Sequence, residues 1–258
     1  MTPWPRSEVI RMAAQIEIVR RNLLVSSLAL GVLAGITFLA APQIDLIASR
    51  AFHLGDGAFL GQSLGWVRTL RKGFIGVFYL SIAITLTGLI MTRGSARRWL
   101  QLTRAQWLFV SICLIIGPGI ITNVVLKDHW GRARPKQVVE FGGAKTFTPP
   151  LIPTDQCANN CSFVSGEAAA IFMPFYAAGL VVPQWAVALL VSGTLFGFLA
   201  GLVRISQGAH FLSDVIFAAV FMAFTATMAH RAVFGRAFLA RAGLAPLQIR
   251  SEQSVNAD

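Results

Sequence analysis

The chain has 258 residues, of which 55% are hydrophobic and only 13% are charged. A soluble domain normally carries about twice that share of charged residues, so the composition argues against a soluble protein. The net charge of +11 would fit a nucleic-acid-binding protein, but the basic residues lie between apolar stretches rather than on one polar face or arm. Basic residues between apolar stretches are typical of membrane proteins, so we expect a membrane environment and no nucleic-acid partner.

Six stretches are long and apolar enough to cross a bilayer, which requires about 20 helical residues. Any one of them could be a soluble core helix, but six in one chain predict an all-α protein, a six-transmembrane helical bundle. The fourth stretch is short and could begin earlier in the chain. The predicted spans are Leu23–Pro42, Gly73–Thr92, Gln106–Leu126, Glu167–Val182, Trp185–Val203 and Phe211–His230.

The spans divide the chain into an N-terminal segment (1–22), a six-span domain (23–230) and a basic tail (231–258). The first span is longer than the core of a signal peptide and is interpreted as a retained anchor. Before it, Ser7–Asn22 mixes apolar residues with arginines, which is typical of a helix that lies in the membrane interface. An extension of the first span would have the same pattern.

Charge predicts the orientation of the chain. With an even number of spans both termini lie on one side, and 12 of the 22 Lys and Arg residues fall there: four in the N-terminal segment, four in the loop 93–104 and four in the tail. This bias favours a bacterial inner-membrane protein with both termini in the cytoplasm.

The two longest polar connections, Ile44–Lys72 and Lys127–Ser165, then face the periplasm. The second is rich in Pro and Gly, so we expect an irregular loop, and a loop of this length is usually functional. Within it, Cys157 and Cys161 could form a disulfide in an oxidising periplasm or remain free thiols.

Unusual polar residues gather where four of the spans end. All four ends emerge on the outer side, so we expect one polar cluster there, at one depth. The cytoplasmic ends of the same spans show nothing comparable. The residues are Lys127 at the end of the third span, Ser165, Gly166 and Glu167 at the start of the fourth, Arg204 at the end of the fifth, and His210 and Asp214 at the start of the sixth.

The cluster has the chemistry of a phosphate site. Ser165 and Gly166 lie where a helix begins, so backbone N–H groups and the helix dipole can face an anion. His210 and Asp214 are four residues apart and share one helical face. The carboxylate can hold one ring nitrogen and leave the other free as a nucleophile or base. Positive charge, which binds phosphate oxygens, comes from Lys127, Arg132, Arg134 and Arg204.

Three motifs resemble a known family. Lys127-Asp-His-Trp-Gly-Arg-Ala-Arg134-Pro135 has the form K-x6-R-P, and the segment from Arg204 to Asp214 has the form R-x5-H-x3-D. Between them, Val164-Ser165-Gly166-Glu167 stands where a P-S-G-H block would be. In order and spacing these motifs resemble the type 2 phosphatidic acid phosphatase superfamily, which includes membrane lipid phosphatases and the soluble haloperoxidases. The resemblance covers roughly 106–230.

This resemblance implies a metal-independent phosphatase without a cofactor, which hydrolyses a lipid phosphate monoester or diphosphate through a phosphohistidine. His210 would attack phosphorus, and Asp214 would orient His210. The phosphoryl oxygens would be held by Lys127, Arg134, Arg204, Ser165 and the Gly166 amide.

Glu167 departs from the family pattern, because a histidine that protonates the leaving group usually stands there. Arginines favour the ionised carboxylate, whereas burial favours the protonated acid. Four interpretations are therefore open: Glu167 is the general acid, His129 replaces it, the leaving group needs little help, or Glu167 only pairs with an arginine.

The substrate is expected to be an anionic phospholipid or glycolipid, but the motifs do not identify the part of it beyond the phosphate. They do not indicate the oligomeric state either. The Ser-Gly-Glu variant and the loop are similar to bacterial lipid A phosphatases, which favours lipid A dephosphorylation. Undecaprenyl diphosphate and phosphatidylglycerol phosphate are the rival substrates. A hypothesis of a different class is a non-catalytic transporter or binder of anionic lipids.

Overall fold

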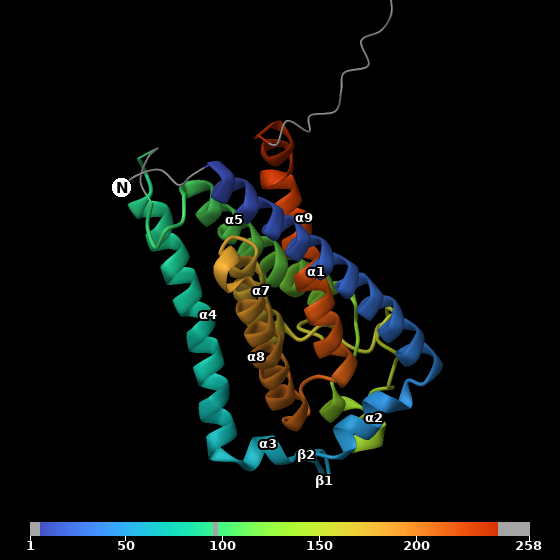
Figure 1. Cartoon of the computed structure of the whole chain (residues 1–258). Coiled ribbons are helices and arrows are strands. Elements are labelled where there is room, and N and C mark those ends of the chain that lie inside the picture. The colour runs from blue at the N-terminus through green and yellow to red at the C-terminus, as the bar shows by residue number, and fades with distance from the viewer. Residues whose placement is uncertain (1–5, 95–97, 242–258) are drawn as a thin grey trace, which may run out of the picture.

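The computed structural model describes residues 6–94 and 98–241, and these fold almost entirely into helices (Figure 1). The all-α class is thereby confirmed. The long helices are α1 (Arg6–Ala40), α4 (Gly65–Met91), α5 (Arg104–Leu114) with its π-helical continuation η1 (Ile115–Leu126), α7 (Gly166–Gly179), α8 (Ala186–Ser206) and α9 (Leu212–Arg241). The short elements are α2 (Gln43–Arg50), β1 (His53–Gly55), β2 (Ala58–Phe59), α3 (Leu60–Ser63), α6 (Lys127–His129), η2 (Pro135–Gln137), η3 (Val139–Phe141) and η4 (Pro183–Trp185).

Five helices within 6–94 and 98–241 are long and apolar enough to cross a membrane. They match five of the predicted spans. The fourth predicted span forms α7, which has only 14 residues, so the count of six spans is not confirmed. The five are Ala14–Ala40, Gly65–Met91, Arg104–His129, Pro183–Ser206 and Leu212–Gly235.

The predicted terminal segments join the neighbouring helices as far as the structure describes them. Helix α1 is continuous from Arg6, so the segment before the first span extends that helix instead of forming a separate interfacial one. Helix α9 continues to Arg241, and the rest of the predicted basic tail lies outside the described residues.

Hydrogen bonds fix which helix ends lie together. The turn between α7 and α8 accepts from two side chains: Gln15 Nε2 donates to Pro183 O and Gln106 Nε2 donates to Val181 O, each at 3.2 Å. This turn therefore lies level with the start of α5 and with the early part of α1. At the opposite end, Figure 1 shows α2, the β1–β2 hairpin and α3 below the bundle.

The two long connections that were predicted to share one side do pack together. The ring of Phe59, in β2, meets that of Phe141, in η3, with centroids 5.5 Å apart. Phe211, at the start of the last long helix, belongs to the same buried cluster. Both connections thus cover the helix ends from which the polar residues emerge, and we call this end of the bundle the loop end.

The glycines of α8 let its neighbours approach closely. A Cβ atom would lie 2.3 Å from the Phe175 Cβ at Gly193, and 2.2 Å from the Phe172 ring at Gly197. Both phenylalanines belong to α7, so these glycines are used for packing within the bundle. The close contact of α7 and α8 holds the start of α7 against the end of α8.

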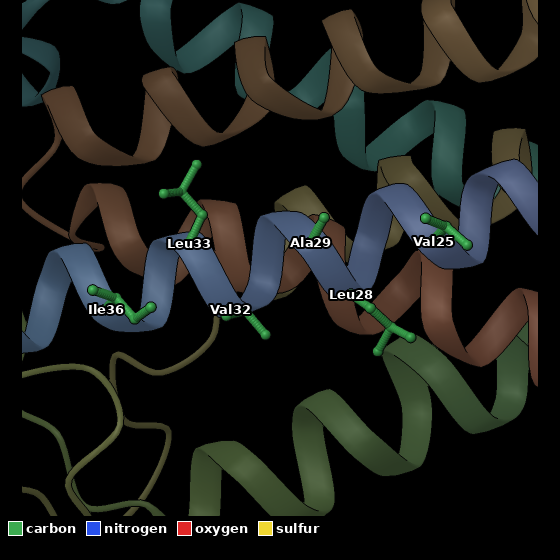
Figure 2. A pocket seen from close by; sticks show the side chains of 6 residues that line it. All are labelled: Val25, Leu28, Ala29, Val32, Leu33 and Ile36. Atoms are coloured by element: carbon green, nitrogen blue, oxygen red, sulfur yellow. The ribbon is translucent and has the colours of Figure 1, made fainter.

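The outer face of α1 is apolar and open. Val32, Leu33 and Ile36 are each more than 60% exposed, as side chains in contact with lipid would be. Figure 2 shows a shallow apolar hollow along this face, lined by Val25, Leu28, Ala29, Val32, Leu33 and Ile36.

We predict that Gly197→Ala lowers the thermal unfolding temperature, because the added methyl group overlaps Phe172 and overpacking costs about 1–3 kcal/mol. Gly76→Ala in α4 is the matched control, since a Cβ there meets open space. Equal unfolding temperatures for the two variants in the same detergent would contradict the packing role.

Candidate active site

His210 lies in the turn between α8 and α9 and is almost completely buried, with 1% of its surface exposed. Its Nδ1 lies 2.7 Å from the backbone oxygen of Ser162 and 3.7 Å from Asp214 Oδ2. A carbonyl oxygen can only accept, so Nδ1 carries the hydrogen and Nε2 presents a lone pair. The hydrogen bond that we expected from Asp214 is thus made by a carbonyl of the middle motif. Burial lowers the pKa of His210 to about 4, so the ring is neutral at physiological pH.

Asp214 is fully buried and faces three donors in addition to the nearby ring. Its Oδ2 accepts from Ser162 Oγ at 2.5 Å and from the Phe211 amide at 2.8 Å. Its Oδ1 accepts from Arg132 Nη1 at 2.6 Å. These bonds keep the carboxylate ionised and fix it beside the ring of His210.

Arg132 is fully buried, so the phosphate-facing position that the sequence suggested for it is wrong. Its guanidinium pairs with two buried carboxylates, that of Asp214 and, through Nη2 at 2.8 Å, that of Asp45 in α2. It also donates from Nε to the Thr148 carbonyl at 2.9 Å. The segment after α6 is irregular and turns at Gly131, whose φ is +71°, so Arg132 is buried while Arg134 contacts Asn160. Sequence reasoning missed Asp45, which carries no motif.

The start of α7 is built to receive an anion. The Ser165 amide donates to the Asp214 carbonyl at 3.1 Å, which joins the middle motif to the last one. Its hydroxyl is buried and has no partner among the described residues. At Gly166 a Cβ atom would lie 2.8 Å from Lys127 Nζ, so the ammonium group lies close to the free N–H groups of the first turn.

Glu167 is bound to two arginines. Arg71 of α4 donates from Nη2 and Nε to its carboxylate at 2.8 and 3.0 Å, and Arg204 Nε lies 3.4 Å from Oε1. Arg204 also donates from Nη1 to Gln207 Oε1 at 2.5 Å. No motif in the sequence points to Arg71, which resembles an ordinary charged anchor near the start of an apolar helix.

Lys127 and Arg134 meet at Asn160, a third residue that sequence reasoning missed. Arg134 Nη2 donates to the Asn160 backbone oxygen at 2.6 Å and to its Oδ1 at 2.8 Å. Lys127 Nζ is 3.4 Å from the same Oδ1. Cys157 and Cys161, on either side, form a disulfide with Cα atoms 5.6 Å apart.

The predicted polar residues therefore come together at the loop end, along the starts of α7 and α9 and the ends of α6 and α8. The arrangement combines a neutral imidazole, several cations and a helix N-terminus, which suits attack on a phosphoryl group. His129 does not share these contacts: it is exposed, and its Nδ1 lies 3.0 Å from the Val124 carbonyl of its own helix.

We predict that Arg132→Met lowers the free energy of unfolding by about 3–5 kcal/mol, because it leaves two buried carboxylates without a counter-ion. Arg50→Met, in the exposed last turn of α2, is the control. Thermal unfolding of both purified variants tests this, and an unchanged transition for Arg132→Met would show that the ion pairs are dispensable.

Comparisons with known proteins agree with this geometry. The chain is 34% identical over 194 residues to the lipid A 4'-phosphatase of Francisella tularensis subsp. novicida. The aligned region covers 73% of this chain and 86% of that relative. It is 35% identical to the lipid A 4'-phosphatase of Rhizobium etli over 69% of this chain and 74% of the relative. The lipid A 4'-phosphatase of Rhizobium leguminosarum is 34% identical over 69% of this chain and 82% of the relative.

No solved structure matches the chain. The model of the PAP2 superfamily matches residues 105–238, which include all three motifs. The resemblance noted from those motifs is thereby confirmed, and the chain belongs to the PAP2 superfamily.

Proposed function

We propose that this protein is a lipid A 4'-phosphatase, a membrane enzyme that hydrolyses the phosphate ester through a phosphohistidine. The observation that carries the proposal is a buried, neutral His210 with its hydrogen on Nδ1, which leaves Nε2 as a nucleophile beside the cations. The names of the three relatives support lipid A as the substrate and the 4' position as the site of hydrolysis.

In the first step, Nε2 of His210 attacks phosphorus while the bond from phosphorus to the lipid oxygen breaks, and the departing lipid oxygen takes a proton from water. Lys127, Arg134 and Arg204 bind the three phosphoryl oxygens, and the Ser165 hydroxyl and Gly166 amide add neutral donors. The unpartnered Ser165 hydroxyl supports this role. Because charge develops on these oxygens during transfer, preorganised donors contribute most in the transition state.

In the second step, water attacks phosphorus, the bond from phosphorus to nitrogen breaks, and phosphate leaves with His210 restored. The imidazolium character that grows during attack is stabilised by Asp214, whose Oδ2 lies 3.7 Å from Nδ1. Arg132 keeps that carboxylate charged and in place.

Glu167 acts in this proposal as the acceptor that aligns Arg71 and Arg204. Its carboxylate receives a bidentate hydrogen bond from Arg71, which favours the ionised form over a proton donor. Arg71 then becomes an additional cation at the rim of the site, 40% exposed and within reach of a substrate head group.

The proposed orientation places the loop end in the periplasm and both termini in the cytoplasm of the bacterial inner membrane. The excess of basic residues on the side of the termini supports it. The disulfide at the loop end supports it as well, because disulfides persist in an oxidising compartment.

We predict that His210→Ala lowers phosphate release from lipid A by a factor of about a thousand or more, because the nucleophile is lost. Purified protein in detergent, assayed for released phosphate, tests this. Labelled phosphate should also be trapped as an acid-labile adduct on the wild type and not on the variant.

His230→Phe is the control, since His230 packs between Phe109 and Phe234 at the opposite end of the bundle. It should retain activity. Phosphate release that persists in His210→Ala would refute the proposed enzyme mechanism. A lipid-binding protein without catalytic activity would release no phosphate in the wild type or in any variant.

Glu167→Gln separates the two roles of this residue. Loss of the charge that aligns the arginines should slow the hydrolysis of alkyl and aryl phosphates alike, by roughly tenfold. A general acid would matter much more for an alkoxide leaving group than for a phenolate. A steep loss confined to alkyl phosphates would therefore establish Glu167 as the proton donor.

The lipid itself is identified by comparing lipid extracts of cells with and without the protein. We expect lipid A species that differ by one phosphate at the 4' position. If only the level of undecaprenyl diphosphate or phosphatidylglycerol phosphate changes, that lipid is the substrate in place of lipid A, and the proposed reaction mechanism stands.

A further inference from the structure

We infer that Asn160, held by the Cys157–Cys161 disulfide, positions the two phosphate-binding cations of the first motif. The inference rests on the proposed function, since it concerns the same site. Asn160 is a positioning residue, because it touches Lys127 and Arg134 and acts on the phosphoryl group only through them.

Asn160 presents two oxygens to the pair of cations. Its backbone oxygen accepts from Arg134 Nη2 at 2.6 Å and from Nε at 3.2 Å. Its side-chain Oδ1 accepts from Arg134 Nη2 at 2.8 Å and from Lys127 Nζ at 3.4 Å. One neutral residue therefore bridges two like charges that would otherwise repel each other.

The contacts leave the opposite edge of the arginine available. A guanidinium group has five N–H donors, and Asn160 engages those on Nε and Nη2. The Nη1 donors have no hydrogen-bond partner within the described part of the chain, so they remain for a phosphoryl oxygen. Fixing one edge orients the other, which is the benefit expected from a preorganised site.

The short loop from Cys157 to Cys161 holds Asn160 in place. Its backbone φ is +49°, a left-handed conformation that asparagine adopts more readily than most residues. Its amide donates to Asp128 Oδ1 at 3.3 Å, and the next amide, that of Cys161, donates to the Lys127 carbonyl at 2.9 Å. These two hydrogen bonds tie the loop to the same turn of α6 that carries Lys127, and the disulfide closes the loop on itself.

The test uses Asn160→Gly, because glycine accepts a positive φ and only Oδ1 is lost. We expect the inhibition constant of inorganic phosphate and the KM for lipid A to rise about tenfold, as for loss of a hydrogen bond to a charged group. Asn159→Gly is the matched control: it is the neighbouring asparagine in the same loop, it is exposed, and its side chain makes no hydrogen bond with the described residues. It should leave both constants unchanged.

A second variant, Cys157→Ser with Cys161→Ser, tests the role of the disulfide. It should raise the phosphate inhibition constant, and its combination with Asn160→Gly should raise it by less than the product of the separate effects. If this variant does not fold, reduction of the wild-type protein by a thiol replaces it, with thermal unfolding recorded in each case.

Equal constants for Asn160→Gly and Asn159→Gly would overturn the inference. If His210→Ala still abolishes release in that case, the phosphatase proposal stands and only the role of Asn160 falls. If His210→Ala retains release, the proposed function fails first, and it fails independently of Asn160.

Discussion

The buried guanidinium of Arg132 between two carboxylates is the constraint on which the site depends. Asp45 comes from α2, Asp214 from α9 and Arg132 from the loop after α6, and all three side chains are inaccessible to solvent. Burying these charges is costly unless each is paired, so the three segments can meet in only one arrangement. Because Asp214 also lies beside the ring of His210, the same pairing places the proposed nucleophile.

The remaining charges of the site follow a related rule. The cations proposed to bind phosphate repel one another, and each of them contacts an acceptor group of the protein. Glu167 pairs with Arg71 and Arg204, and Gln207 also accepts a hydrogen bond from Arg204. Asn160 accepts hydrogen bonds from the cations of the first motif. The acceptors lower the repulsion and fix one side of each cation, and the proposed function assigns the other side to the substrate. A site of high positive charge is thus compatible with a stable fold.

The sequence predicted the helical class, the shared end of the polar residues and the family, because long apolar spans and spaced motifs depend on local pattern alone. It could not predict the inward turn of Arg132, since the direction of each side chain in the irregular segment after α6 depends on tertiary contacts. Nor could it predict Arg71 opposite Glu167, which are far apart in sequence and meet only through helix packing. The length of α7 was overestimated because Leu180–Val182 is apolar but lies beyond the helix end.

The shortness of α7 has a consequence for how a lipid meets the enzyme. Its far end is level with the start of the α5 span, and 14 residues at about 1.5 Å each reach only about 21 Å of a hydrocarbon layer about 30 Å thick. Helix α7 alone is therefore too short to cross the hydrocarbon layer, and the irregular connection before it completes the path to the loop end. The proposed function requires a lipid to bring its phosphate to the start of α7 while its acyl chains remain beside the longer spanning helices.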